Sequence, residues 1–517
     1  MLRAHAILRT LRRLHSTEAA VLEYTTRNAE ILKNLSKWYP SLSNLPKPTT
    51  DVSHFIKQYR DLKEDDRSVS HVLQGKITNV RFSGTKIGFI NLWNSNESLQ
   101  LIVNFSNLSM PIEEFKKHLR QFKIGDHIQV SGFPGVSQRQ GTLSLKVTSA
   151  LQMLAPAQQP VPPKLVNPSK RNSNKVLDYL VNGTKPLLIR HKITKRIREW
   201  LYKQDFIEVE TPIISGKSNG ANAKPFITHC TAINKEQPFE LRIAPELWLK
   251  RLCIGGMDKI FEIGKVFRNE GIDSTHNPEF TTLEFYQCYI NMEQLIEMSE
   301  SLLVYVCQGI DTPRAKTLLQ QLEANNWKFK RLEFLPTLTD KTGIPFETLD
   351  LNNAILLKEE LAKANIHISP SSVSPQQILD ELCGKYIESQ CNTLIPTIIY
   401  HHPTVLSPLA KTDPNNVQIT KRFEIFINGK EYINAYEEEN CPDLQLEKFT
   451  NQREAKNQFN DDEMMAVDLP YVQAMKYGMP PIGGFGLGID RLCMLLADTQ
   501  RIEEVLTFGT LDDVNRQ

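Results

Sequence analysis

Hydrophobic and polar positions alternate in two neighbouring stretches near the middle of the chain. The first places Phe261, Ile263 and Phe267 on one face, and residues 279–286 repeat the alternation. This period of two predicts two β-strands joined by a loop. One face of the second strand carries two aromatic rings, a hydroxyl group and a carboxylate, from Phe280, Thr282, Glu284 and Tyr286.

The loop between these strands is charged and is longer than an ordinary hairpin loop of about two to five residues, which favours a binding loop. Arg268 has the planar donor geometry that suits a phosphate or a carboxylate. Phe280 offers a ring on which a base could stack. Periodicity alone leaves equally open a surface hairpin whose charges pair with one another.

A second hairpin is predicted around the Asn-Gly pair at 428–429, which is the strongest short turn signal. With these two residues as the turn, Phe426 pairs with Glu431 and Ile425 pairs with Tyr432.

This hairpin places Glu424 and Glu431 on one face as diagonal neighbours, about 7–8 Å apart at their Cα atoms. Two carboxylates this close repel each other unless a cation lies between them. Hard oxygen ligands of this kind suit Mg²⁺ shared with phosphates. Asn434, Tyr436 and Glu438 fall on the opposite parity, so a β-bulge after Glu431 would be needed to bring all five to one pocket.

A glycine-rich strand followed by a helix is predicted at residues 483–498. The glycines allow close approach of the backbone, and Arg491 lies in the first turn of a helix whose Leu492, Leu495 and Leu496 face the core. Dinucleotide sites also combine glycines with a helix, but no βαβ unit surrounds this stretch.

Residues 67–154 predict five short strands and one helix-like insertion, the pattern of an OB-type barrel, which commonly binds single-stranded RNA. The chain carries a formal charge of only +2, yet residues 67–150 hold ten lysines or arginines against four acids. This excess favours a polyanionic partner. A solvated basic surface, or a barrel that only packs on its neighbour, is the alternative.

The remaining segments differ in composition. Residues 1–17 contain four arginines, no acid and an apolar stripe at roughly helical spacing, which is typical of a mitochondrial transit peptide. A basic amphipathic first helix of the mature protein is the alternative. We expect a helical extension at 18–66, a Pro-, Asn- and Lys-rich linker at 155–180, and a large domain at 181–517 with a helical insertion at about 293–390.

The length of 517 residues suffices for two or three domains. No stretch approaches eighteen consecutive apolar residues, so no membrane span is expected. The eight cysteines form no Cys-x-x-Cys pair, which argues against a zinc site or a disulfide framework.

Three stretches resemble the motifs of the class II aminoacyl-tRNA synthetases. FRNEG and HNPEFTTLEFY, within residues 267–286, resemble motif 2 in its lysine-specific form. GGFGLGIDR at 483–491 resembles motif 3, and the helix, strand and Thr-Pro at 190–212 resemble motif 1. The resemblance implies an α+β fold, with an N-terminal OB-type β-barrel followed by an antiparallel sheet flanked by helices, in a homodimer.

The resemblance also implies roles for individual residues. The implied ATP-binding residues are Arg268, Glu270, His276, Phe280, Glu424 and Arg491. Of these, Arg268 and Arg491 would be catalytic. The implied lysine-binding residues are Gly220, Glu246, Glu284, Tyr286, Asn434 and Glu438. The metal ligands for Mg²⁺ would be Glu424 and Glu431. In the barrel, Phe89 would stack on the middle anticodon base and Gln100 would read its edge.

The implied activity is ligation of L-lysine to tRNA(Lys) with ATP, through lysyl-adenylate and pyrophosphate, in the mitochondrial matrix and without a membrane partner. Two other interpretations stay open. A sister enzyme for aspartate is disfavoured because its pocket needs cations where this chain offers Glu246, Glu284 and Glu438. An inactive, synthetase-like RNA-binding or regulatory protein is disfavoured because Arg268, Arg491, Glu424 and Glu431 are all present.

Overall fold

The computed structural model describes residues 22–138, 141–216, 220–221, 223–233, 238–459 and 467–515. The chain divides into two compact units. One runs to Asn167 and includes Val176–Gly183, and the other contains Pro168–Lys175 and continues from Thr184. The predicted transit peptide lies outside the described residues. Within the described part of the chain, no helix is long and apolar enough to cross a membrane.

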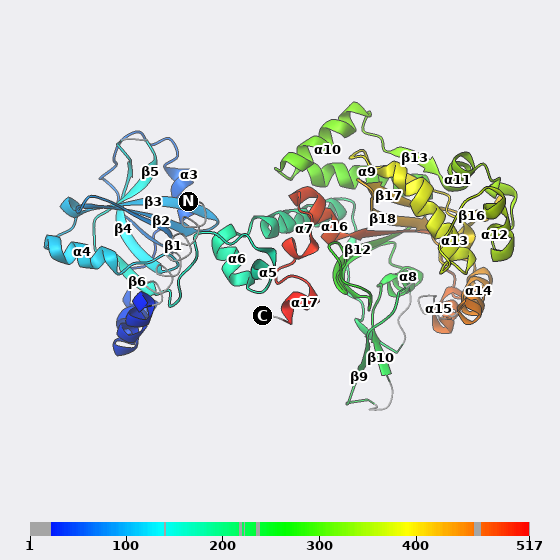
Figure 1. Cartoon of the computed structure of the whole chain (residues 1–517), viewed down its shortest axis with the longest axis horizontal. Helices are drawn as coiled ribbons and strands as arrows, with labels where there is room; N and C mark the ends of the chain where they lie inside the picture. Colours follow the sequence, from blue (N-terminus) through cyan, green and yellow to red (C-terminus); the bar gives the residue numbers. More distant parts are fainter. Residues whose placement is uncertain are drawn as a thin grey trace, which may run out of the picture. The chain divides into compact units, whose positions relative to one another are not determined.

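The first unit contains a six-stranded sheet (Figure 1). Its strands are β1 (His71–Ser83), β2 (Ile87–Asn94), β3 (Glu97–Asn104), β4 (His127–Val136), β5 (Leu143–Val147) and β6 (Gln152–Ala155). They pair in the order β1-β2-β3-β5-β4-β6, and β1 also pairs with β4, which closes the barrel. The expected OB-type barrel is therefore confirmed, with α4 (Ile112–Arg120) as the helical insertion between β3 and β4.

One strand of the barrel differs from the prediction. Residues 141–154 were expected to form a single strand, but they form β5 and β6. β5 pairs with both β3 and β4, whereas β6 pairs only with β4. The chain leaves the sheet between them, where Leu151 turns into the core.

Helices of the N-terminal extension pack on this barrel. Residues 22–33 are helical and are followed by α2 (Leu35–Trp38) and α3 (Val52–Gln58). Ile31, Trp38 and Phe55 are buried in the same cluster as the inward-facing residues of the barrel strands. The segment expected to be a linker contains two helices, α5 (Pro168–Asn172) and α6 (Lys175–Asn182).

The second unit is built on an eight-stranded sheet in the order β13-β14-β17-β18-β19-β12-β11-β7. The strands are β7 (Ile207–Glu208), β11 (Lys259–Phe267), β12 (Glu279–Cys288), β13 (Lys330–Glu333), β14 (Thr397–Tyr400), β17 (Arg422–Ile427), β18 (Lys430–Glu437) and β19 (Ile482–Gly488). The centre is antiparallel, as expected. The sheet as a whole is mixed, because the edge pairs β13–β14 and β7–β11 are parallel.

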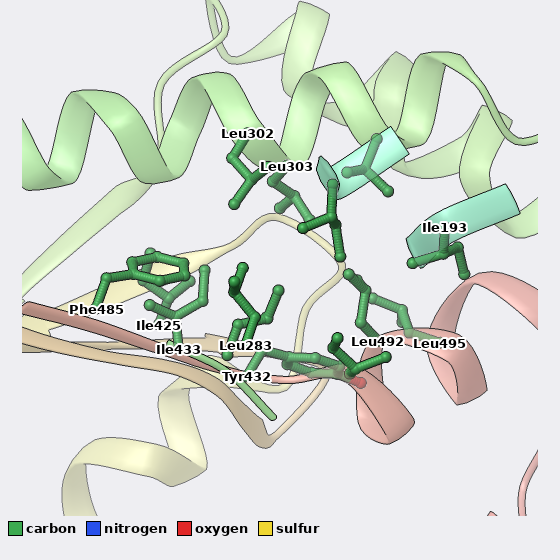
Figure 2. Packing of buried hydrophobic residues seen from close by; sticks show 14 of the residues in the cluster. Ile193, Leu283, Leu302, Leu303, Ile425, Tyr432, Ile433, Phe485, Leu492 and Leu495 are labelled. Carbon is green, nitrogen blue, oxygen red and sulfur yellow. The ribbon is translucent and has the colours of Figure 1, made fainter. Parts of the chain in front are cut away.

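A layer of helices covers one face of this sheet (Figure 1). It comprises α7 (Lys185–Lys203), α9 (Met292–Gln308), α10 (Pro313–Ala324) and α16 (Ile489–Ala497). Figure 2 shows Leu302 and Leu303 of α9 and Leu492 of α16 pointing toward Leu283 and Phe485 of the sheet. Because side chains alternate along a strand, the neighbours of these core residues point to the opposite face.

The opposite side of the sheet carries α8 (Glu246–Ile254), α14 (Pro442–Phe459) and α15 (Leu469–Met475), whose apolar residues share a cluster with Ile260 and Ile482. A small sheet pairs β8 (Ile214–Ser215), β10 (Pro238–Leu241) and β9 (Ile227–His229), and another pairs β15 (Thr412–Asp413) with β16 (Asn416–Thr420). The chain's last described helix is α17 (Leu511–Val514).

The helical insertion forms a separate core from α11 (Phe334–Thr342), α12 (Ala354–Lys363) and α13 (Pro375–Leu382). It also contributes β13 to the edge of the main sheet. This strand has the sequence Lys-Arg-Leu-Glu, whose polarity gives no strand signal.

The hairpin of β17 and β18 turns at residues 428–429, and Phe426 pairs with Glu431, as predicted. The predicted pairing of Ile425 with Tyr432 is wrong. Ile425 pairs with Ile433, because the register shifts by one residue between Ile425 and Phe426. Tyr432 is the extra residue, and its ring is buried in the core (Figure 2).

This register shift is the β-bulge that the sequence required. It places Asn434 directly opposite Glu424, so that Glu424, Asn434 and Tyr436 share the face away from the helical layer.

Candidate active site

A cavity of about 440 Å³ opens on the face of the eight-stranded sheet that the helical layer leaves free. Its wall is formed by β12, β17, β18 and β19, by the loop after β11 and by the start of α8. It contains twelve of the site residues predicted from the sequence: Gly220, Glu246, Arg268, Glu270, His276, Phe280, Glu284, Tyr286, Glu424, Glu431, Asn434 and Arg491. Segments more than 200 residues apart in the sequence therefore meet in one site.

Arg268 stands at the end of β11, where its backbone N–H donates to the carbonyl oxygen of Pro278 across the base of the loop. Its guanidinium lies over the ring of Phe280, with 5.2 Å between the guanidinium carbon and the ring centroid. The buried Nε of Arg268 has no hydrogen-bond partner among the described residues. A buried donor without a partner is costly, and an anionic ligand in the cavity would satisfy it.

Arg491 occupies the first turn of α16, as predicted. Its Nη2 lies 2.7 Å from Nε2 of His276, and its Nη1 donates to the backbone oxygen of Glu431. Nδ1 of His276 lies 2.8 Å from Asp273. Burial raises the pKa of Asp273, but hydrogen bonds from Thr275 and His276 outweigh burial and lower the pKa to about 2. The ionised Asp273 orients His276, and His276 in turn orients Arg491 at the cavity.

Glu424 and Glu431 have different surroundings. Arg422 Nη2 donates to Glu424 at 2.5 Å, and His402 Nε2 lies 3.3 Å from the other oxygen of Glu424. Burial raises the pKa of Glu424, but Arg422 and His402 outweigh burial and lower it to about 2. Burial and then Glu424 raise the pKa of Glu431 to about 7. The chain thus supplies part of the positive charge expected beside these carboxylates, as Arg422, which pairs with Glu424. The charge of Glu431 is less fully neutralised by neighbouring cations.

The far end of the cavity is anionic. Tyr436 Oη donates to Glu246 at 2.7 Å, and Tyr286 Oη donates to Glu284 at 3.0 Å. Burial and then the charge of Glu246 raise the pKa of Glu284 from 4.5 to about 8. Glu438 is not in the cavity wall. Its side chain is fully buried, with Oε1 next to Gly484, which lines the cavity.

Two glycines are required by the space around these carboxylates. Gly220 has a φ of +103°, and a Cβ there would lie 3.1 Å from Cβ of Glu246. A Cβ on Gly484 would overlap Oε1 of Glu438 and would lie 2.8 Å from the ring of Tyr286. The glycine-rich strand therefore provides room for the acidic end of the cavity.

Three residues of this site were missed by the sequence analysis: Lys250, Arg422 and His402. Lys250 could have been found from its i,i+4 spacing to Glu246 on α8. Arg422 shares the parity of Glu424, but nothing in the sequence indicates that it pairs with that carboxylate. His402 reaches Glu424 from the segment after β14, a tertiary contact that no local pattern predicts.

In the first unit, Phe89 and Gln100 lie on the outer face of the barrel, because their neighbours Ile90 and Leu101 are buried in its core. Arg81 stacks on the ring of Phe89, with 4.9 Å between the guanidinium carbon and the ring centroid. Gln100 accepts a hydrogen bond from Ser144. A half-buried aromatic ring beside a cation and an amide is a suitable surface for stacking and reading an unpaired base.

Comparisons with known proteins match the two units of the chain to two different families. Residues 167–512 match the family of class II tRNA synthetases (D, K and N), and residues 71–152 match the OB-fold nucleic acid binding domain.

The chain is 45% identical over 552 aligned positions to the mitochondrial lysine–tRNA ligase of Saccharomyces cerevisiae, which covers 97% of this chain and 94% of the relative. It is 38% identical to the mitochondrial lysine–tRNA ligase of Schizosaccharomyces pombe, covering 92% and 90%. It is also 38% identical to the lysine–tRNA ligase of Lactococcus lactis subsp. cremoris, covering 86% and 88%.

Proposed function

The chain belongs to the class II tRNA synthetases of the D, K and N type, and we propose that it is a lysine–tRNA ligase. The observation that supports lysine as the substrate is the charge pattern of the cavity. Arg268 offers a buried donor without a partner, while the far end presents Glu246 and Glu284. An amino acid with a carboxylate at one end and a second ammonium group matches this pattern.

The first step is largely positioning and charge neutralisation. An oxygen of the lysine carboxylate attacks the α-phosphorus of ATP, the bond from that phosphorus to the bridging oxygen breaks, and pyrophosphate leaves. Arg268 holds the α-phosphate and the carboxylate, and Phe280 stacks on the adenine. Glu270 and His276 contact ATP, and Arg491 holds the far phosphates.

The lysine is held by residues at the other end of the cavity. Gly220, Glu246 and Asn434 fix the α-ammonium end, and Glu284 and Tyr286 contact the ε-ammonium group, with the carboxylate of Glu438 buried next to them beside Gly484. In the second step a hydroxyl oxygen of the terminal tRNA ribose attacks the carbonyl carbon and forms the ester bond, the hydroxyl proton is released, and AMP leaves with the electrons of the broken mixed-anhydride bond.

Glu424 and Glu431 are the residues that would hold Mg²⁺. They fit this ion because both are carboxylates in the cavity wall beside the phosphate-binding arginines, and hard oxygen donors shared with phosphates are its usual ligands. No group of three or more candidate metal ligands occurs among the described residues. When bound, the ion neutralises charge on the phosphates.

The barrel recognises the tRNA. We assign residues 67–154 to anticodon binding, with Phe89 stacking on the middle base and Gln100 reading its edge. Residues 181–517 form the catalytic domain, joined to the barrel through residues 155–180.

The protein acts in the mitochondrial matrix as a homodimer. The relatives from Saccharomyces cerevisiae and Schizosaccharomyces pombe are named as mitochondrial, and residues 1–17 have the composition of a transit peptide. The homodimer is supported by the edge strand β7 and the residues after it, where Ile207, Ile213 and Ile214 are about half exposed. An exposed apolar edge of this kind is normally buried against another protein surface, here a second copy of the chain.

The experiment that tests the proposal is amino-acid-dependent exchange of pyrophosphate into ATP. Lysine alone should support exchange. Aspartate-dependent exchange would identify the sister enzyme instead, and the absence of exchange with every amino acid would identify an inactive, RNA-binding protein.

A further inference from the structure

Lys250 is a buried cation for which the proposed reaction has no role. Its side chain is fully buried on α8. The ammonium group forms ion pairs with Glu246, at 2.5 Å, and with Glu438. Burial lowers the pKa of Lys250, but the two carboxylates raise it well above its usual value, so the side chain is charged.

The ammonium group of Lys250 contacts only one oxygen of each carboxylate. It contacts Oε1 of Glu246 and Oε2 of Glu438. Within the described part of the chain, Oε2 of Glu246 and Oε1 of Glu438 accept no hydrogen bond. Oε1 of Glu438 lies against Gly484, which is part of the cavity wall. The ion pairs therefore fix two carboxylates that each keep one oxygen without a partner on the described chain, in the cavity wall for Glu246 and next to that wall for Glu438.

The charges also balance. Glu246, Glu284 and Glu438 carry three negative charges when ionised, and Lys250 reduces the sum to two. Lysine has two ammonium groups, and its carboxylate is taken by Arg268. With Lys250 in place, the acidic end of the cavity therefore matches the charge of this substrate. Without it, one carboxylate would stay unpaired or take up a proton.

We propose that Lys250 is a positioning residue that sets substrate specificity, because it holds the carboxylates of Glu246 and Glu438 in fixed positions relative to each other. The inference rests on the proposed function. Lys250 does not touch the substrate. It fixes Glu246, which lines the cavity, and Glu438, which lies next to the cavity wall, so its removal releases Glu438 from α8 and relaxes the selection for side-chain length.

The test is Lys250→Met, compared in pyrophosphate exchange with lysine and with ornithine, which is one methylene shorter. A methylene in a binding pocket is worth about 10–200-fold in kcat/KM. We expect the ratio of kcat/KM for lysine to that for ornithine to fall by about tenfold or more. Arg251→Met is the matched control, since Arg251 is next along α8 but pairs with Asp468. It should leave the ratio unchanged.

An equal fall for both amino acids in Lys250→Met would overturn the inference and assign Lys250 to the stability of the fold. If Lys250→Met does not fold, Lys250→Arg decides, because its longer, planar group displaces the two carboxylates while keeping the charge. The ratio must then change, and an unchanged ratio overturns the inference. A wild-type chain without lysine-dependent exchange would instead refute the proposed function.

Discussion

Glu284 offers a test of how the cavity recognises an ammonium group. Burial, followed by the charges of Glu246 and Glu262, raises its pKa to about 8, against the opposing effects of the Tyr286 hydroxyl group and Arg268. At pH 7 a group with this pKa is protonated about ten to one. An ammonium group favours the ionised carboxylate, so lysine binding should release this proton.

The magnitude follows from the difference between the pKa and the pH. At pH 7, ionising Glu284 costs about 1.4 kcal/mol, the equivalent of one pH unit. The dissociation constant for lysine should therefore fall about tenfold between pH 6 and pH 7 and level off above pH 8. About 0.9 proton should be released for each lysine bound at pH 7.

Titration calorimetry in buffers of different ionisation enthalpy measures this release directly. The enzyme should be free of ATP and Mg²⁺, so that Glu424 and Glu431 do not contribute. Glu284→Gln is the matched control: it should bind lysine more weakly and release no proton. Tight, pH-independent lysine binding without proton release by the wild-type chain would refute the assignment, as would the same release from Glu284→Gln.

Three further predictions concern other parts of the molecule. Glu424→Gln should lower the free energy of unfolding by about 1.5–3 kcal/mol, because Arg422 loses a charged partner. It should also lower pyrophosphate exchange, and this activity should recover partly as the Mg²⁺ concentration is raised. Normal exchange at every Mg²⁺ concentration would exclude Glu424 as a ligand. Phe89→Ala should weaken tRNA charging by the value of one stacked base, about 1–3 kcal/mol, and spare lysine activation; equal damage to both would make Phe89 a structural residue. Deletion of residues 1–17 should leave exchange intact and abolish import into isolated mitochondria, and normal import would refute the targeting signal.

The central hairpin and the barrel could be predicted because their alternation is local. Phe280, Glu284 and Tyr286 lie on one strand, so their shared face follows from the period of two. The bulge at Tyr432 could be inferred only because Glu431 and Asn434 had to reach one pocket. The pairing of Ile425 was missed because a bulge moves one residue without changing the composition.

Other features depend on contacts between distant segments. β13 is too polar to be recognised as a strand, and it forms only because β14 offers a free edge. The i,i+4 spacing predicts the pair of Lys250 with Glu246, but its second partner, Glu438, lies nearly 190 positions away and has no local signal. The burial that raises the pKa of Glu284 comes from the closed site as a whole and has no local sequence signal.

The most direct test of the central claim is an aminoacylation in which the enzyme chooses its own substrate. Purified protein, ATP, Mg²⁺ and total mitochondrial tRNA are incubated with all twenty amino acids together, and the amino acid esterified to tRNA is identified by mass spectrometry. The account predicts lysine alone, attached to tRNA(Lys). Aspartate or asparagine on the tRNA, or no esterified amino acid, would contradict it.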